Sequence, residues 1–390
     1  QADALFTPWP EADAIIGNPP FLGGKHMRLN LGDGYIDRVF ARFPDVRDSV
    51  DFCSYWFRLA HDALKDDGRA GLVATNSIRH GKSRRATLDY IKQNGGFIGS
   101  AVSTQPWSGE ANVHVSIVNW SKQEPDSCRL DDQEVEVINT SLRSTTDVSE
   151  AASLQVNRGY CFQGVIPVGK GFNVDPATAL EWLAADLKNA EVVKPFSMGS
   201  NLAKQPLGEP DRWIIDFNDL TMEAAEAFCE PFQQVKEQVR PQRMENRRET
   251  TRVNWWWYGE KRPAMRMALA SLDRFFAVGE VSKWAVFLPC RANWLCGNKN
   301  KVVASDDFYI LALLTSDVHR QWMHAQKGTL EDRTAYTHDT CFETFPFPQQ
   351  VTAIQAEAIR QQMIGLNDYR NAWMVEQQKG ITDMYNRYFN

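Results

Sequence analysis

The sequence predicts an α/β sheet in the first part of the chain, an α+β region in the middle and a helical segment at the C-terminus. Short apolar runs alternate with helical patterns over residues 12–120, as in a mainly parallel sheet covered by helices. From about residue 155 the strands are isolated, and connections rich in Gly and Pro separate them from helices. Residues 351–387 then show an almost unbroken helical pattern, in which Gly380 is the one candidate for a break.

The first region opens on a short apolar strand, Ala14–Ile16, that ends at Gly17. Residues 51–65 place large apolar side chains at helical spacing, and the Asp-Asp-Gly that follows is expected to stop this helix. Further along we expect strands at 71–75, 97–102 and 113–120 and a helix at 87–93. The last two strands should pair antiparallel, because the stretch 103–112 between them is too short for a crossover helix.

A polar stretch marks the first domain boundary. Residues 121–150 are rich in Ser, Thr, Asp and Glu and contain one further strand candidate, 135–139. The region that follows is expected to contain strands at 213–217 and 285–288 and helices at 177–189, 223–239 and 264–275. Because 390 residues are too many for one ordinary core, we expect three domains, at residues 1–150, 151–349 and 350–390.

The composition is that of a soluble globular protein, with 43% hydrophobic and 24% charged residues. No run of 18 apolar residues occurs, and the first residues lack the basic and apolar parts of a signal peptide. We therefore expect no membrane contact and a cytoplasmic location. The 7 cysteines are scattered and never spaced as Cys-x-x-Cys, which favours free thiols. No group of cysteines and histidines has metal-ligand spacing, so we predict no metal.

The sharpest motif is the loop Asn18-Pro19-Pro20-Phe21, which directly follows the first strand. An exocyclic amine on a nucleobase is a poor nucleophile, because its lone pair is delocalised into the ring. A catalyst must place acceptors against both N–H groups, and Asn18 Oδ1 and the Pro19 carbonyl can serve. The two prolines lock the loop at the end of a strand, where open α/β sheets bind ligands. Phe21 offers an apolar face to a base that has left the duplex.

A direct in-line transfer of a methyl group at this loop needs neither a metal nor a covalent intermediate. The alternative interpretation is structural: the prolines end the strand, and Phe21 belongs to the core. The position directly after a buried-type strand, together with basic segments further along, favours the catalytic interpretation. Asn18, Pro19, Pro20 and Phe21 are therefore the predicted catalytic residues.

The loop resembles the motif (N/D/S)PP(Y/F/W) of S-adenosylmethionine-dependent amino-methyltransferases, in which Asn at the first position is typical of adenine-N6 enzymes. Other stretches, at 169–172, 189–196, 255–269 and 342–348 (FETFPFP), are similar to the MmeI-type (type IIL) single-chain restriction-modification enzymes. This resemblance covers most of the chain. It implies part of a Rossmann-like methyltransferase sheet, an α+β target-recognition domain that binds DNA, and C-terminal helices.

The resemblance also implies S-adenosyl-L-methionine as the cofactor. Such enzymes bind it mainly through a Gly-rich strand-to-helix turn well before the Asn-Pro-Pro-Phe loop, yet only 17 residues precede Asn18 here. The glycines at 32–34 and 95–96 do not follow an apolar strand and open a helix, so neither pair is the cofactor turn. Asn18 remains the one cofactor-binding candidate. We expect a fragment that binds cofactor poorly and methylates little on its own.

Two basic segments are candidates for DNA contact in a chain whose net charge is −6. Residues 236–266 carry nine Lys or Arg against four Glu and include four consecutive aromatics, of which alternation would bury about two. The expected phosphate contacts are Arg243, Arg247, Arg248, Arg252, Lys261 and Arg262. An ion-paired, solvated helix is the alternative, because Glu245 and Glu249 lie among the arginines. The expected base contacts, in a polar loop after an apolar strand, are Arg291, Asn298, Lys299 and Lys301.

The main hypothesis is therefore a restriction-modification methyltransferase that transfers a methyl group to adenine N6 in double-stranded DNA and acts as a monomer. One alternative is an amine methyltransferase that acts on protein glutamine or RNA, because similar loops occur there. A second alternative is a DNA-specificity module without catalysis. The roughly 200 residues after the catalytic sheet disfavour the first alternative.

Overall fold

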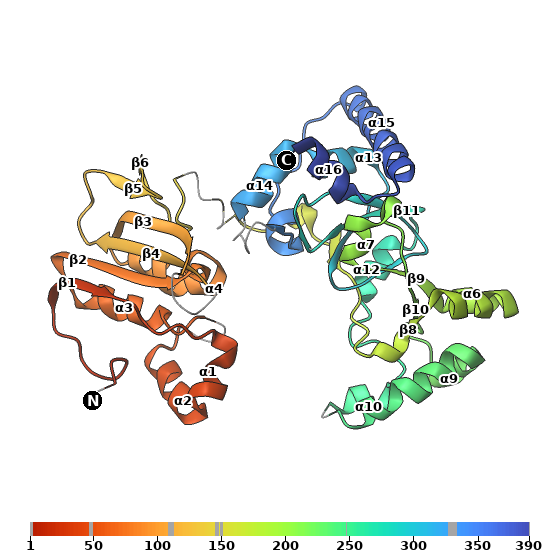
Figure 1. Cartoon of the computed structure of the whole chain (residues 1–390), viewed down its shortest axis with the longest axis horizontal. Helices are drawn as coiled ribbons and strands as arrows, with labels where there is room; N and C mark the ends of the chain where they lie inside the picture. The colour runs from red at the N-terminus through yellow and green to blue at the C-terminus, as the bar shows by residue number, and fades with distance from the viewer. Residues whose placement is uncertain are drawn as a thin grey trace. The chain divides into compact units, whose positions relative to one another are not determined.

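The computed structural model describes residues 3–46, 50–107, 113–144, 148, 151–246, 248–326 and 334–389. The chain divides into two compact units, Gln1–Glu150 and Ala151–Asn390, and each is described by itself (Figure 1). Within the described residues, none of the helices combines the length and the apolar character that a membrane span requires.

The first unit is built on a six-stranded sheet of order β1-β2-β4-β3-β5-β6. The strands are β1 (Ala12–Gly17), β2 (Leu64–Thr75), β3 (Phe97–Pro106), β4 (His114–Ser121), β5 (Cys128–Leu130) and β6 (Gln133–Val135). Only the pairs β1–β2 and β3–β5 are parallel, so the expectation of a mainly parallel sheet is wrong. Short connections join β3 to β4 and β5 to β6 and force antiparallel pairing, as expected for β3 and β4.

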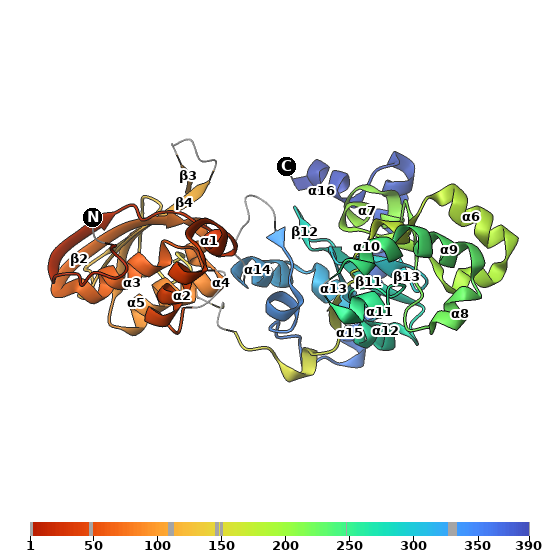
Figure 2. The same ribbon diagram turned by 90° about the horizontal axis from the view of Figure 1, so that it is seen from below.

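Helices of the first unit connect the parallel strands β1 and β2 and then β2 and β3. They are α1 (Gly24–Leu31), α2 (Asp33–Arg42), α3 (Ser54–Ala63), η1 (Asn76–Arg79), α4 (Gly81–Arg84), η2 (Arg85–Asp89) and α5 (Tyr90–Gln93). Helices α3 and α5 lie on the same side of the sheet (Figure 2). Their core includes Phe57 of α3, whose ring stacks on Trp120 of β4 at 5.4 Å between centroids.

Two details of the first unit differ from the sequence prediction. The predicted helix over 51–65 ends at Ala63, and the Asp-Asp-Gly that was expected to stop it lies inside β2. Gly68 is required there, because a Cβ at this position would lie 2.9 Å from the Ala12 carbonyl oxygen of the neighbouring strand. The predicted strand 135–139 is also wrong, since β6 ends at Val135.

The second unit contains two four-stranded sheets, ordered β14-β9-β10-β8 and β13-β11-β15-β7, and the strand pair β12–β16. The strands are β7 (Cys161–Gln163), β8 (Asn173–Val174), β9 (Val193–Ser197), β10 (Trp213–Ile215), β11 (Arg274–Gly279), β12 (Val281–Ser282), β13 (Leu288–Arg291), β14 (Leu295–Cys296), β15 (Asn300–Val303) and β16 (Thr334–Ala335). This mixture of short strands and separate helices is the predicted α+β region.

The helices of the second unit are shorter than their periodicity suggested. They are α6 (Pro176–Ala185), α7 (Gly199–Lys204), α8 (Met222–Glu226), α9 (Cys229–Gln238), α10 (Arg240–Met244), α11 (Glu249–Val253), α12 (Pro263–Leu269), α13 (Phe308–Thr315), α14 (Asp317–Gln326), α15 (Ala353–Gln377) and α16 (Ile381–Phe389). The predicted helix 223–239 is two helices. The predicted helix 264–275 ends at Leu269, and Phe275 belongs to β11. The predicted strand 285–288 begins only at Leu288, since Ala285 has a left-handed φ of 48°.

The C-terminal helical pattern is confirmed, including its break. Helix α15 ends at Gln377, Gln378 adopts a left-handed φ of 50°, and α16 begins after Gly380. A Cβ at Gly380 would lie 2.4 Å from the backbone of Lys204, so glycine allows α16 to approach α7. Both C-terminal helices therefore pack within the second unit.

Candidate active site and nucleic-acid interface

The Asn18-Pro19-Pro20-Phe21 loop leaves the sheet at the carboxyl end of β1, beside the parallel strand β2. Pro19 is buried and fixes the turn, whereas Asn18 is exposed and Phe21 is half-buried. Among the described residues, no group forms a hydrogen bond with the Asn18 side-chain amide. Both of its polar atoms are therefore free to meet a substrate amine.

A polar cluster lies where β2 ends. The hydroxyl groups of Thr75 and Ser77 both donate hydrogen bonds to Oδ2 of Asp51, which precedes α3. The next residue, Phe52, donates its backbone N–H to the Leu22 carbonyl at 2.9 Å and so connects this cluster to the Asn18 loop. Polar groups from β1, β2 and the start of α3 thus gather at one edge of the sheet, where open α/β sheets bind ligands.

Phe21 has an aromatic neighbour that the sequence did not indicate. Its ring meets the ring of Trp107, directly after β3, edge to face at 6.1 Å between centroids and an interplanar angle of 76°. Phe21 also packs against the core of the first unit. The ring is thus held in position while part of it stays accessible.

The described residues provide few groups for a cofactor or a metal. The glycines at 32–34 join α1 to α2, and those at 95–96 join α5 to β3, so neither stretch follows a strand and opens a helix. No group of three His, Cys, Asp or Glu side chains within the described residues has the arrangement of a metal site.

The predicted DNA contacts fall into three groups by exposure. Arg248, Arg291 and Lys299 are exposed, and Arg252, Lys261, Arg262 and Asn298 are half-buried. Arg243 and Lys301 are buried, each with only 4% of its surface exposed. Arg247 lies outside the described residues.

The two buried cations, Arg243 and Lys301, lie among backbone groups and strands of the second unit. Arg243 Nη2 donates hydrogen bonds to the carbonyls of Pro167 and Val168 at 2.7 and 2.8 Å, and burial lowers the pKa of its guanidinium. Lys301 lies in β15 between the paired strand positions Val278 and Gln163. Because neither side chain is presented to solvent, we remove both from the set of DNA-contact candidates.

The structure brings the two basic segments together through Gln163, at the end of β7. Its Oε1 accepts a hydrogen bond from Arg262 Nη2 at 2.9 Å, and its Nε2 donates to the Asn298 carbonyl at 3.0 Å. Backbone bridges continue this contact, since Ile166 pairs with Glu260 and Val165 with Gly297. Arg262 and the backbone of Asn298 are therefore held close together by the same side chain.

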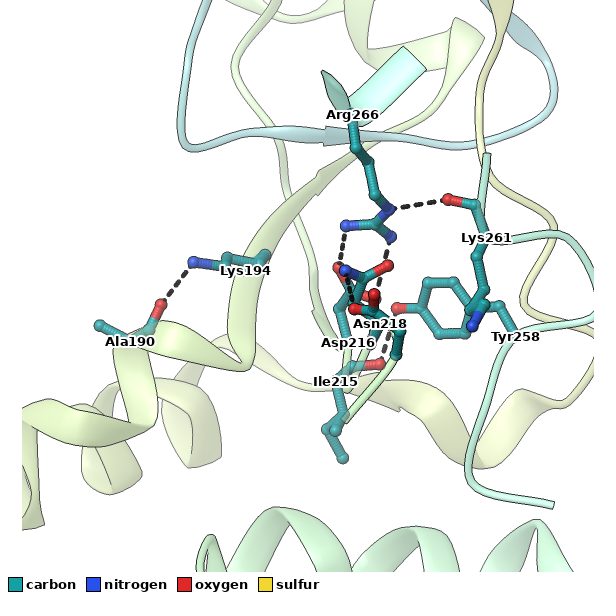
Figure 3. Close-up of polar contacts among 9 residues, drawn as sticks. Ala190, Lys194, Ile215, Asp216, Asn218, Tyr258, Lys261 and Arg266 are labelled. Carbon is teal, nitrogen blue, oxygen red and sulfur yellow. Dashed lines mark hydrogen bonds and ion pairs between the residues drawn. The ribbon is translucent and has the colours of Figure 1, made fainter. Parts of the chain in front are cut away.

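An ion pair fixes the first of these segments. Arg266 of α12 donates two hydrogen bonds to Asp216 and one, from Nε at 2.7 Å, to the carbonyl of Lys261 (Figure 3). Figure 3 also shows the Tyr258 hydroxyl turned toward the Ile215 carbonyl, to which it donates at 2.6 Å. Burial raises the pKa of Tyr258 well above its usual value. The loop from 258 to 262 is thus held on β10.

The four consecutive aromatics of this segment belong mainly to the core. Trp255, Trp256 and Tyr258 are buried and Trp257 is half-buried, so three rather than about two are buried. The indole N–H groups of Trp256 and Trp257 both donate to the Leu220 carbonyl at 2.9 Å. The ammonium group of Lys261 lies 3.6 Å from the centroid of the Trp257 ring. These aromatic residues position the basic side chains.

Sequence reasoning missed Gln163, Asp216 and Trp107. Gln163 and Asp216 act through partners about 50 to 135 residues away, so no local pattern indicates them. Trp107 ends an ordinary strand pattern, and only the antiparallel pairing of β3 with β4 places it beside Phe21.

Comparison with known proteins identifies both units. The family model described as "MmeI, DNA-methyltransferase domain" matches residues 7–131, and the one described as "MmeI, target recognition domain" matches residues 161–349. A search of curated proteins found no match.

Among solved structures, the chain is similar to the type IIL restriction-modification enzyme MmeI in complex with DNA. The TM-score is 0.77 at 19% sequence identity, over 95% of this chain and 52% of that chain, so the chain spans about half the length of that structure. LlaBIII, an ATP-dependent type ISP enzyme bound to DNA, matches at TM-score 0.43 and 11% identity, over 94% and 30% of the two chains. The DrdV–DNA complex matches at 0.40 and 12%, over 91% and 44%. These two scores are too low to support conclusions about the fold.

The two domain matches lie in the order and in the two units that the fold shows, and the TM-score of 0.77 extends the likeness over nearly the whole chain. The chain therefore belongs to the MmeI family, of which it carries the DNA-methyltransferase domain and the target recognition domain.

Proposed function

We propose that this chain is part of a site-specific DNA methyltransferase of a restriction-modification system, which transfers a methyl group from S-adenosylmethionine to N6 of adenine. The observation that carries the proposal is the exposed, unpaired amide of Asn18 at the carboxyl end of β1. A strand end that presents a polar group without a partner is a ligand-binding position in open α/β sheets.

The chemistry follows from two acceptors and one ring. Asn18 Oδ1 and the Pro19 carbonyl each accept one N–H of the adenine amine, which draws its nitrogen toward tetrahedral geometry and frees the lone pair. Phe21, steadied by Trp107, provides a face on which the base stacks after it leaves the duplex. After transfer the cationic nitrogen loses one proton, which passes to solvent.

S-adenosylmethionine supplies an electrophilic methyl group when bound. In the described part of this chain, Asn18 and the exposed end of β1 are the groups that fit one side of such a cofactor. We propose that the chain alone binds the cofactor weakly. Neither glycine-rich stretch, at 32–34 or at 95–96, follows a strand and begins a helix, as a cofactor-binding turn does.

The second unit is the proposed DNA reader. Its candidates for phosphate contact are Arg248, Arg252, Lys261 and Arg262, and those for base contact are Arg291, Asn298 and Lys299. Arg247, outside the described residues, stays in the phosphate set on sequence grounds. The hydrogen bonds of Gln163 to Arg262 and to the Asn298 carbonyl support this assignment, because they hold one residue of each basic segment close to the other.

The decisive experiment measures methyl transfer from labelled S-adenosylmethionine to a duplex DNA library with the full-length protein. We expect N6-methyladenine in one sequence motif and a loss of most transfer in Asn18→Ala, with DNA affinity nearly unchanged. Asn30→Ala is the matched control, because Asn30 is also exposed in the first unit but lies on α1.

Three outcomes would contradict the proposal. The first is methylation of protein or RNA substrates with none on duplex DNA, and the second is unchanged transfer in Asn18→Ala. The third is an equal loss of methylation and DNA affinity in Asn18→Ala, which would indicate misfolding and a structural role for the loop.

A further inference from the structure

A cavity of about 590 Å³ lies in the second unit, among α14, α15, α16 and the loop before β13. This volume is within the range of small-molecule sites. The residues that line it include Trp284, Thr315, Arg370, Tyr385 and Phe389. None of these belongs to the basic segments at 240–266 or 289–301, so the cavity is separate from the proposed DNA surface.

Arg370 of α15 is an incompletely paired buried cation. It is 1% exposed, and its Nη2 contacts the Tyr385 hydroxyl, but Nε and Nη1 have no hydrogen-bond partner among the described residues. Within the same residues, no carboxylate forms an ion pair with it. The guanidinium also lies 5.3 Å from the centroid of the Tyr385 ring, but a buried charge without an ion pair is costly, and its unsatisfied donors call for an explanation such as a bound ion.

The other polar groups of the cavity are also compatible with an anionic ligand. Thr315 Oγ1 is buried without a partner in the described chain. The second guanidinium of the lining, Arg320, is already paired with Asp317 through Oδ1. Asp317 and Arg320 neutralise each other. The charge of Arg370 is not neutralised, so the lining of the cavity carries one excess positive charge.

Aromatic side chains form the walls around this charge. The rings of Trp284, Tyr385 and Phe389 lie 5.5 to 6.0 Å apart between centroids. Trp284 Nε1 donates to Asn386 Oδ1 at 3.0 Å, which fixes the indole. Phe389 is 63% exposed at the rim of the cavity. Contact with a flat ligand ring would bury part of this apolar surface, which is favourable.

We propose that this cavity binds a small molecule that carries a flat ring and one anionic group. The anion pairs with Arg370, and the ring packs against the cluster of Trp284, Tyr385 and Phe389. A phosphate of a nucleotide and the carboxylate of an aromatic acid share this chemistry, so the experiment tests one of each. The Tyr385 hydroxyl contacts Nη2, and Nε and Nη1 are buried, so Tyr385 must move aside for the anion to reach the guanidinium.

The test is isothermal titration calorimetry on the full chain with AMP and with indole-3-acetate. We expect one of the two to bind with 1:1 stoichiometry. Adenosine and inorganic phosphate, which each lack one half of the chemistry, should bind about tenfold more weakly or worse. Arg370→Met should weaken the binding of the preferred probe by about tenfold or more, because it removes the charge but keeps the length of the side chain.

Two controls separate a ligand site from a structural arginine. Arg360→Met, on the same helix but paired with Asp307 outside the cavity, should bind the probe like the wild type. Unliganded Arg370→Met should melt at the same or a higher temperature, since it loses an unpaired buried charge.

Failure of both ring anions to bind would overturn the proposal. Equal binding of the preferred probe to wild type and Arg370→Met would also overturn it, because the probe would then occupy another site. A lower melting temperature of unliganded Arg370→Met would show that the arginine is structural. None of these results bears on methylation at Asn18.

Discussion

Arg266 donates two hydrogen bonds to the buried carboxylate of Asp216, from Nη1 to Oδ2 at 2.7 Å and from Nη2 to Oδ1 at 3.0 Å. The Asp216 side chain is only 4% exposed. The third donor of the guanidinium, Nε, reaches the Lys261 carbonyl. One arginine therefore couples the end of β10 to the loop that presents Lys261 and Arg262.

Arg266→Met should destabilise the second unit, because it leaves the Asp216 carboxylate buried without its partner. Breaking a buried ion pair in this way costs about 3–5 kcal/mol. Urea unfolding followed by tryptophan fluorescence would measure the loss, since several buried tryptophans lie in this unit.

Arg212→Met is the matched control, because Arg212 pairs with Asp211 while both side chains are nearly half exposed. An exposed pair is worth about 0–1 kcal/mol, so this variant should unfold almost like the wild type. Equal midpoints for Arg266→Met and Arg212→Met would mean that the Asp216 pair contributes no more than a surface pair.

The contrast between Asn18 and Asp216 explains how much of the site could be predicted from the sequence. The chemistry at Asn18 resides in four consecutive residues after a strand, so local pattern and residue type indicate it. Asp216 and Gln163 have partners far away in sequence, and only the folded chain joins them. The same limit applies to Arg243: charge pattern alone cannot distinguish a solvated cation from one that donates to the carbonyls of Pro167 and Val168.

Strand and helix boundaries show a similar limit. The Asp-Asp-Gly after α3 has the composition of a turn, yet it lies in β2 because Gly68 allows close approach to Ala12. Residues 264–275 have helical spacing, but the chain must turn after Leu269 to enter β11. Tertiary contacts decide such boundaries, whereas the break at Gly380 was visible because glycine itself permits it.

Phe21→Ala should lower kcat/KM for methylation, because it removes the ring on which the flipped base stacks. Stacking of one base on an aromatic ring is worth about 1–3 kcal/mol, which corresponds to roughly 5- to 150-fold in rate. Phe21→Tyr keeps a ring and should retain most activity. Steady-state methylation by the full-length protein would test this, and equal activity of the alanine and tyrosine variants would contradict it.

Lys299→Ala should weaken binding to the recognised sequence and relax discrimination at one base pair, because Lys299 is a proposed base contact, and the loss of one cation should reduce the slope of log affinity against log salt by about 1. Lys299 is exposed, and its one ion pair in the described chain, with Glu280, is loose at 3.7 Å. Fluorescence anisotropy at several salt concentrations would measure the slope. Lys92→Ala, an exposed lysine on α5, should leave affinity and slope unchanged. An unchanged slope in Lys299→Ala would remove this residue from the interface.

His80 should make the first unit less stable in acid. Burial, together with Arg79, Arg143 and Arg84, lowers the pKa of His80 to about 3. The unfolded chain has a His pKa of about 6.5, so it binds the extra proton between pH 6.5 and 3. The stabilisation is therefore complete above pH 6.5 and is lost as the pH falls, by about 2 kcal/mol between pH 7 and pH 5.

The variant His80→Asn should lose this part of the pH dependence. The measurement compares unfolding free energies of wild type and variant at pH 7 and pH 5. His26→Asn serves as the control, because His26 is exposed on α1. Parallel losses of stability in wild type and His80→Asn would show that His80 contributes nothing to the acid sensitivity.

Gln163→Leu should weaken DNA binding although Gln163 is not itself among the proposed contacts. The substitution removes the acceptor of Arg262 and the donor to the Asn298 carbonyl, so the two segments lose their link. Each hydrogen bond is worth about 1 kcal/mol in stability, and the half-buried site keeps the loss small. Gln234→Leu is a matched control, because Gln234 also makes two hydrogen bonds in this unit, to the carbonyls of Gly171 and Asn173.

A double-mutant cycle decides whether Gln163 acts by positioning Arg262. If it does, Gln163→Leu and Arg262→Ala each lower DNA affinity, and the double variant loses less than the sum, because both changes remove the same contact. Additive losses would mean that Gln163 affects binding by another route. Equal affinities of Gln163→Leu and Gln234→Leu would show that any effect comes from general destabilisation, since each variant loses two hydrogen bonds but only Gln163 contacts Arg262.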